Sequence, residues 1–133
     1  MSFQITIQDL PADEAYLEGV NHRTGMGGAT FSVMMALGGI ERPDDPEPGY
    51  YHGLVDANKL HENLTAFLRA DEAEQLRRLA EVCQRILVYC SLDSDGKVPM
   101  SPPRLARILP YVEDIAKVSG NAVNRGKQLA YSG

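Results

Sequence analysis

The sequence predicts a mainly helical α+β domain, in which about four helices pack together and the two ends of the chain pair in a small sheet. Two long segments, residues 71–90 and 101–119, carry apolar side chains at the spacing of one helical face. Near the N-terminus apolar and polar residues alternate, as in a strand with one buried face, and Leu129 and Tyr131 alternate likewise near the C-terminus. The length of 133 residues predicts a single compact domain over residues 1–133.

Composition disfavours several functional classes. Hydrophobic residues make up 44% of the chain and charged residues 23%, close to the soluble globular average, which argues against disorder. The formal net charge of -5 disfavours a dedicated nucleic-acid binder, because such proteins concentrate basic side chains on one surface. The sequence shows neither a signal-peptide pattern nor a run of about 18 apolar residues. We therefore expect a cytoplasmic protein that makes no membrane contact.

The first third of the chain begins with a predicted strand over residues 2–8, followed by a short helix over residues 13–20. Residues 21–28 are polar and contain three glycines, which favour an irregular backbone, so they are predicted to form a loop. Residues 29–37 are short and mostly apolar, and periodicity alone does not separate a buried helix from a buried strand there. Helix-forming methionine and leucine with flanking glycines favour a helix.

The middle of the chain opens with a predicted exposed connection over residues 41–49, which hold three prolines and four acidic side chains. Residues 50–55 fit either a brief strand or a loop packed on the core, and both alternatives stay open. Asp56 is placed to cap the next helix. The buried stripe expected on that helix consists of Leu60, Leu64, Phe67 and Leu68.

The strongest helical pattern follows Asp71 and Glu74, whose spacing is typical of an N-terminal cap. It predicts an amphipathic helix of about five turns. Its apolar face consists of Leu76, Leu79, Cys83, Ile86, Leu87 and Cys90. On such a helix Cys83 and Cys90 lie about 10 Å apart along the axis, too far for a disulfide, so both are expected to be reduced core residues. The polar run after this helix, residues 93–97, is predicted to be a turn.

The last long helix is predicted to begin after a Ser101 cap, with prolines in its first turn. Pro110 removes one backbone donor and crowds the preceding turn, so we expect a kink or a break there. Residues 120–126 are expected to end the helix, and a short closing strand then pairs with the first strand. The buried face of this helix is expected to hold Leu105, Ile108, Val112, Ile115 and Ser119.

The first candidate site is the glycine-rich stretch directly before the apolar helix of residues 29–37. Backbone N–H groups at such a junction can bind a phosphate or carboxylate, and an arginine can add a bidentate contact. The residues concerned are Asn21, His22, Arg23, Thr24, Gly25, Gly27 and Gly28. They match neither of the common phosphate-binding glycine motifs, so an ordinary connecting loop is the favoured interpretation.

The second candidate is Tyr50, Tyr51 and His52, which can form a ligand wall or a protein interface because tyrosine offers a large surface with a polar tip. Core or turn packing is the favoured interpretation. His22, His52 and His61 lack the spacing of a metal site and are expected at the surface, so neither a metal nor a cofactor is expected.

Two further motifs fail on their spacing. The run from Ser91 to Gly96 has the start of a calcium loop but places Pro102 where a bidentate glutamate belongs. No serine lies in a GxSxG motif, so no hydrolase chemistry and no catalytic residue is assigned.

The order of features resembles a group of small bacterial and phage-encoded proteins for which no activity is assigned. The resemblance lies in Asn21 ahead of an apolar helix that ends in Leu-Gly-Gly-Ile at residues 37–40, and in the closing segment of residues 126–133. Those proteins more often close with Trp-Gly, where this chain has Tyr131-Ser132-Gly133. The resemblance implies an accessory protein of a bacterium or its virus.

Together these patterns predict a binding or regulatory protein, rather than an enzyme, that acts through protein–protein contact or as a homodimer. The alternative is a site at residues 21–28 that binds or modifies an anionic small molecule or a nucleotide, with His52 and the two tyrosines as its walls.

Overall fold

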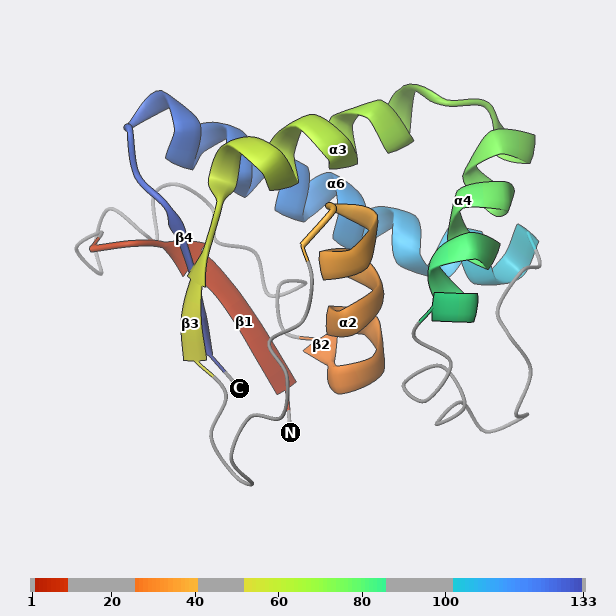
Figure 1. The fold of residues 1–133 in the computed structure, drawn as a ribbon, viewed down its shortest axis with the longest axis horizontal. Helices are drawn as coiled ribbons and strands as arrows, with labels where there is room; N and C mark the ends of the chain where they lie inside the picture. Colours follow the sequence, from red (N-terminus) through yellow and green to blue (C-terminus); the bar gives the residue numbers. More distant parts are fainter. Residues whose placement is uncertain (1, 10–25, 41–51, 86–101, 133) are drawn as a thin grey trace.

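The computed structural model describes residues 2–9, 26–40, 52–85 and 102–132 (Figure 1). These residues form four strands and four helices, and they confirm a mainly helical α+β fold with a small sheet. The strands are β1 (Ser2–Ile7), β2 (Met26–Gly27), β3 (His52–Val55) and β4 (Leu129–Ser132). The helices are α2 (Gly28–Leu37), α3 (Ala57–Arg69), α4 (Glu72–Arg85) and α6 (Pro102–Asn124).

The sheet is antiparallel with the strand order β2-β1-β4-β3, so the two chain ends pair at its centre. This confirms the predicted pairing of the terminal strands. Ile7 lies opposite Leu129, which in turn lies opposite Val55, and all three side chains are buried on the same face. In Figure 1 the four helices lie to one side of this sheet, with α3 passing over α6 and α4 at the end of α3 far from the strands.

Residues 52–55 take the strand alternative, and glycine at position 53 makes room for an aromatic ring. Tyr131 lies opposite Gly53, and a Cβ atom at that glycine would be 2.8 Å from the Tyr131 hydroxyl oxygen. The same ring lies 5.2 Å from the ring of Phe31 on α2, measured between centroids. Tyr131 therefore covers the edge of the sheet and joins it to α2, as aromatic residues commonly do over a strand glycine.

Residues 28–37 are helical, which confirms the favoured interpretation. Five apolar residues along this helix are buried, namely Phe31, Val33, Met34, Met35 and Leu37, and so is Ser32. A helix buried on several sides shows no single apolar stripe, which explains why periodicity alone did not identify it. The predicted loop over residues 21–28 is wrong at its end, because Met26 and Gly27 pair with β1 and Gly28 begins α2. That pairing satisfies backbone groups that a loop would leave to water.

The α2 helix ends in a left-handed residue, Gly39, whose φ is +74°. The Gly39 N–H donates to the Ala36 carbonyl at 3.0 Å, and the Ile40 N–H donates to the Met35 carbonyl at 2.8 Å. This is the Schellman arrangement, which satisfies the last carbonyls of a helix.

Two of the three predicted N-terminal caps are present, and the third, Ser101, lies outside the described residues. Asp56 accepts from the backbone N–H of Lys59 at 3.1 Å, and Asp71 accepts from that of Glu74 at 2.8 Å. The buried stripe of α3 is confirmed at Leu60, Leu64 and Phe67, with Leu68 half-buried. On α4, Leu79 and Cys83 are buried and Leu76 is half-buried, whereas Ile86, Leu87 and Cys90 lie outside the described residues.

The α6 helix runs without a break through Pro110, so the break is the wrong alternative there. A proline inside a helix costs about 3 kcal/mol, but burying a large apolar side chain gains about 1.5–3 kcal/mol. Buried residues on both sides of the proline, Leu105 before it and Val112 and Ile115 after it, therefore outweigh its cost. The helix ends at a second Schellman arrangement around Gly126, whose φ is +65°.

The predicted helix over residues 13–20, the acidic connection over residues 41–49 and the turn over residues 93–97 lie outside the described residues. Among the helices that the structure describes, none combines the length and the apolar character that a membrane span requires.

Candidate functional site

The two predicted ligand-binding groups are only partly described. Asn21, His22, Arg23, Thr24 and Gly25 lie outside the described residues, as do Tyr50 and Tyr51. Gly27 lies in β2, Gly28 is the first residue of α2, and His52 begins β3. Because β2 and β3 are opposite edges of the sheet, Gly27 and His52 are separated by two strands. The described members of the two groups are therefore not brought together.

His61 is half-buried against α6 rather than fully at the surface. Its Nδ1 lies 2.9 Å from the Ala116 carbonyl oxygen, which can only accept, so this nitrogen donates. The hydroxyl of buried Ser119 donates to the same carbonyl at 2.9 Å and lies 3.4 Å from Nδ1. A Cβ atom at Gly120 would be 2.9 Å from the imidazole ring. These contacts join α3 to α6, and the burial of Ser119 leaves no access for a substrate.

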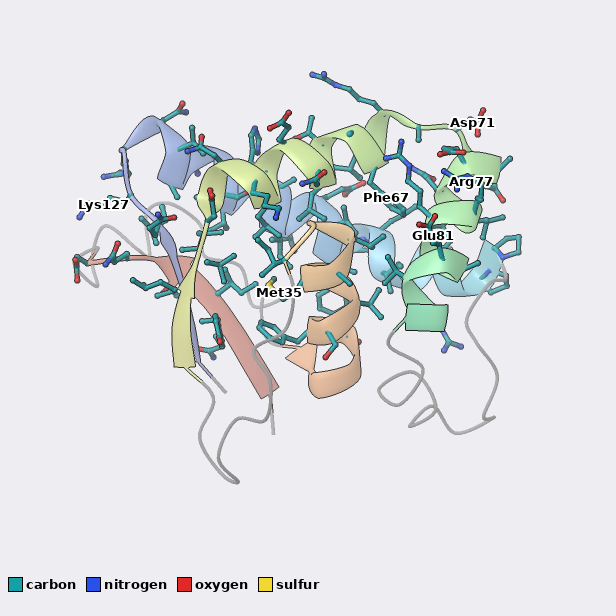
Figure 2. The ribbon with its side chains drawn as sticks, in the orientation of Figure 1. Met35, Phe67, Asp71, Arg77, Glu81 and Lys127 are labelled. Atoms are coloured by element: carbon teal, nitrogen blue, oxygen red, sulfur yellow. The ribbon has the colours of Figure 1, made fainter. Side chains whose placement is uncertain are left out.

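A groove of about 240 Å³ opens where the end of α2 meets α3 and α4. Its lining consists of Ala36, Leu37, Gly39, Asn63, Phe67, Arg78, Glu81 and Val82. Figure 2 labels Phe67 on α3 and Glu81 on α4, which both line the groove at this corner of the molecule. We treat this groove as the candidate functional site, and call it the α2/α3/α4 groove.

The α2 wall of the groove is held by a close contact between two helices. A Cβ atom at Gly38 would lie 2.1 Å from Cδ1 of buried Leu60, so only glycine allows α2 to approach α3 this closely. Asn63 donates through Nδ2 to the Gly38 carbonyl at 3.1 Å and to the Lys59 carbonyl at 2.8 Å. Together with the Schellman bonds, this contact satisfies most of the carbonyl groups at the end of α2 and positions that end at the groove.

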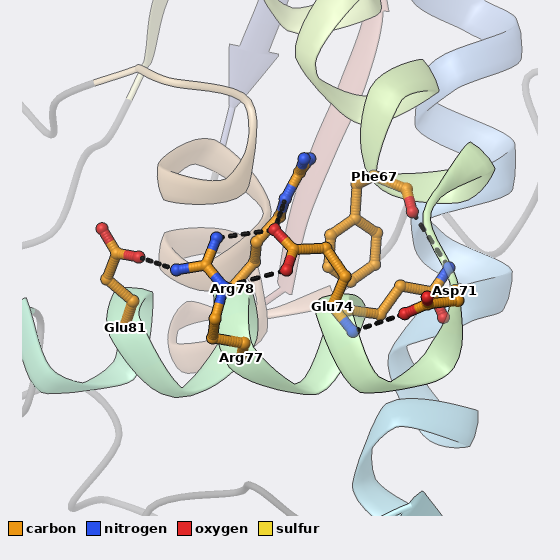
Figure 3. A network of polar contacts seen from close by, with 7 residues as sticks. Phe67, Asp71, Glu74, Arg77, Arg78 and Glu81 are labelled. Atoms are coloured by element: carbon orange, nitrogen blue, oxygen red, sulfur yellow. Dashed lines mark hydrogen bonds and ion pairs between the residues drawn. The ribbon is translucent and has the colours of Figure 1, made fainter.

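The corner between α3 and α4 is held by the carbonyl of Phe67. That oxygen accepts from the Ala70 backbone N–H at 3.2 Å and from Nε2 of Gln75 at 2.9 Å. Gln75 is a buried polar residue, and a hydrogen-bonded buried amide favours one geometry because losing its partner costs free energy. The bond therefore fixes the direction in which α4 leaves α3, with the Asp71 cap between them (Figure 3).

A line of alternating charges runs along the outer face of α4. Arg77 binds both carboxylate oxygens of Glu74, at 2.9 Å through Nε and at 2.6 Å through Nη2, and reaches Glu81 at 3.2 Å through Nη1. Arg78 donates to the same Glu74 carboxylate through Nε at 3.1 Å (Figure 3). The hydrogen bonds from Arg77, and then those from Arg78, lower the pKa of Glu74 from its ordinary 4.5 to about 2.

Replacing Glu74 by glutamine is expected to remove a pH-dependent part of the stability. Because the pKa of Glu74 is lower in the folded than in the unfolded chain, its ion pairs stabilise the fold above pH 4.5. That contribution is lost as the pH falls from about 4.5 toward about 2. The difference in unfolding free energy between the wild type and Glu74→Gln should therefore be largest near neutral pH and shrink in acid. Urea denaturation at several pH values measures it.

The effect is expected to be small, because the side chains of Glu74 and Arg77 are partly or largely exposed and salt screens them. As a control, Glu74→Gln is also introduced into the Arg77→Gln variant. There it should change the free energy of unfolding less than in the wild type, since Arg77 is the main cause of the lowered pKa of Glu74. A difference that stays constant between pH 7 and pH 2.5 contradicts this account.

The walls of the groove offer an apolar floor, an amide, a guanidinium and a carboxylate, and none of these lining side chains is a hydroxyl, thiol or imidazole. Within the described ranges, no three metal-ligating side chains come together. In the sequence the arginines and glutamates of α4 occupy only the polar face of an amphipathic helix. The i, i+4 spacing of Glu74 and Arg78 is the feature of the sequence that indicates an ion pair between them.

Comparison with known proteins finds no family model, no curated protein and no solved structure that matches this chain.

Proposed function

We propose that this chain is a small binding protein that acts by occupying the surface of another protein, and that the α2/α3/α4 groove receives an apolar side chain of that partner. The observation that carries the proposal is the groove itself, an open hollow with Phe67 in its floor and charged residues at its rim. Protein interfaces commonly combine an apolar anchor pocket with a polar rim.

The size of the groove supports a protein partner over a nucleotide. Pockets that enclose drug-sized ligands measure about 300–1,000 Å³. The α2/α3/α4 groove, at about 240 Å³, is below that range and open, so it suits one side chain or a small fragment. The partner is then another protein or a second copy of this chain.

The setting we propose is cytoplasmic, where a thiol such as that of buried Cys83 stays reduced. An accessory role in a bacterium or its virus is part of the same proposal and rests on the resemblance of the sequence.

Filling the groove is expected to abolish binding without unfolding the protein. Ala36 is half-buried on α2 and lines the groove, so Ala36→Phe places a ring where the partner side chain would sit. Peptides selected on the wild type from a random display library should bind Ala36→Phe at least about tenfold more weakly, a loss of about 1.4 kcal/mol. Binding is measured by calorimetry with purified protein and synthetic peptides.

The matched control is Ala106→Phe, which makes the same change at an exposed position of α6. It should leave peptide binding unchanged, and thermal melting should show both variants folded. Peptides that bind the two variants equally well would show that the groove is not the binding surface.

A further inference from the structure

We propose that Arg78 makes the α2/α3/α4 groove selective for a segment in which an apolar side chain lies next to a carboxylate. This inference rests on the proposed function and goes beyond it, because it names the chemical group that the partner must present. The carboxylate is either the side chain of an aspartate or glutamate or the C-terminal carboxylate of a chain.

Glu74 divides its hydrogen bonds unequally between two arginines. Arg77 already binds both oxygens of that carboxylate, at 2.6 and 2.9 Å. Arg78 contributes one longer bond of 3.1 Å, through Nε. A guanidinium has a second edge formed by Nη1 and Nη2, whose parallel N–H groups match the two oxygens of a carboxylate.

The Nη1 and Nη2 edge of Arg78 belongs to a side chain that lines the groove. Arg78 is one of the residues that line the groove, whereas Arg77 is not. In Figure 3 the end of the Arg78 side chain extends from α4 past the Glu74 carboxylate, while Arg77 turns toward Glu81. The side chain of Arg78 is 38% exposed, so its terminal nitrogens are accessible to a ligand while the bond to Glu74 restrains their direction.

The charged side chains at and beside the groove carry a small positive excess. Arg77 and Arg78 offset Glu74 and Glu81 in the network on α4. Lys59 adds a further positive charge, since its Cε lies 3.2 Å from the position that a Cβ atom of Gly39 would take at the groove wall. Counted with the two charged lining residues, Arg78 and Glu81, Lys59 leaves one positive charge in excess, within a chain whose formal net charge is -5. A bound carboxylate complements that local excess.

The apolar part of the ligand follows from the rest of the lining. Phe67, Leu37 and Val82 are nearly fully buried, so they present a floor rather than a deep channel. A short aliphatic side chain fits above such a floor while its own carboxylate, or that of the next residue, reaches Arg78. Leucine is therefore a suitable probe, and its acetylated acid and amide differ only at the group that Arg78 is proposed to bind.

The experiment compares three probes by two-dimensional NMR of the ¹⁵N-labelled full chain at low salt. N-acetyl-leucine carries a terminal carboxylate, N-acetyl-leucinamide carries none, and acetyl-Leu-Asp-amide carries a side-chain carboxylate. We expect all three to shift the amide signals of Gly39, Asn63 and Val82. At least one of the two acids should bind about fivefold more tightly than the amide, and 0.5 M NaCl should reduce that ratio because added salt screens the interaction.

Substitutions at position 78 test the assignment of the residue. In Arg78→Gln the preference for the acid should disappear, and Arg78→Lys should restore part of it, because lysine keeps the charge but not the paired donors. Arg107→Gln removes the same charge from an exposed position on α6 and should keep the full preference. The spectra themselves report whether each variant is folded.

Each outcome decides one point. A preference that survives in Arg78→Gln overturns the role of Arg78. Equal binding of acids and amide to the wild type overturns the carboxylate and leaves the proposed function standing. No shift of the groove signals by any probe overturns the groove as a binding site, and with it both proposals. When only one of the two acids is preferred, the inference holds and the source of the carboxylate is identified.

Discussion

Phe67→Ala is expected to lower the free energy of unfolding by about 3–5 kcal/mol, the largest effect of any single substitution proposed for this chain. Phe67 is 1% exposed and is the largest fully buried residue in the part of the chain that the structure describes. Truncation removes its apolar contacts and leaves a void beneath the groove, because its neighbours come from three helices that are held by their own contacts. Domains are commonly stable by only about 5–15 kcal/mol, so the variant should lose much of its stability.

Urea denaturation followed by circular dichroism measures this loss. Leu68→Ala is the matched control, because Leu68 is the next residue on α3 and is only half-buried. It should lose clearly less stability than Phe67→Ala. A loss below about 1 kcal/mol for Phe67→Ala would mean that the ring is not a core residue, since buried phenylalanines typically cost several times more.

Gly38→Ala is expected to cost about 1–3 kcal/mol, although it adds a single methyl group. That methyl would lie 2.1 Å from Cδ1 of Leu60 and 3.4 Å from the Met34 carbonyl oxygen. Leu60 is fully buried and therefore has little room to turn away. Either the leucine leaves its preferred rotamer or α2 moves away from α3, and the second change would also widen the groove.

The cause can be separated from a general intolerance of glycine replacement. Gly126→Ala is the control, because nothing lies within 4 Å of its Cβ position and its φ of +65° imposes only backbone strain, of about 1 kcal/mol. Combining Gly38→Ala with Leu60→Ala should cost less than the sum of the two single changes, because the second removes the atom that collides. Additive losses would contradict the steric explanation.

The elements that the sequence predicted best are those whose cause is local. Asp56 and Asp71 cap their helices because a side-chain oxygen three residues before a backbone N–H reaches it with little help from the rest of the fold. The stripe on α3 and the alternation in β1 follow in the same way from the period of each backbone. Glycines at positions 39 and 126 end helices because each takes a positive φ.

The candidate site was not predictable in this way. Arg78 and Asn63 belong to different helices, and on each helix they read as ordinary polar residues. They line one groove because Gly38 lets α2 approach α3 and because Gln75 holds α4 at the Phe67 carbonyl. No spacing along the chain encodes those two contacts.

The sequence by itself determined the class of fold, the N-terminal caps of α3 and α4, the buried faces of α3 and α6, and the pairing of the two chain ends. The caps and the buried faces depend on interactions between near neighbours or on one repeating period, whereas the pairing of the ends follows from the need to satisfy the backbone groups of the first strand. Tertiary structure decided that α6 continues through Pro110 and that His61 packs against α6. It also decided where the groove lies. In each case the outcome depends on which distant side chains share a buried contact, and the free energy of that contact exceeds the local preference of the chain.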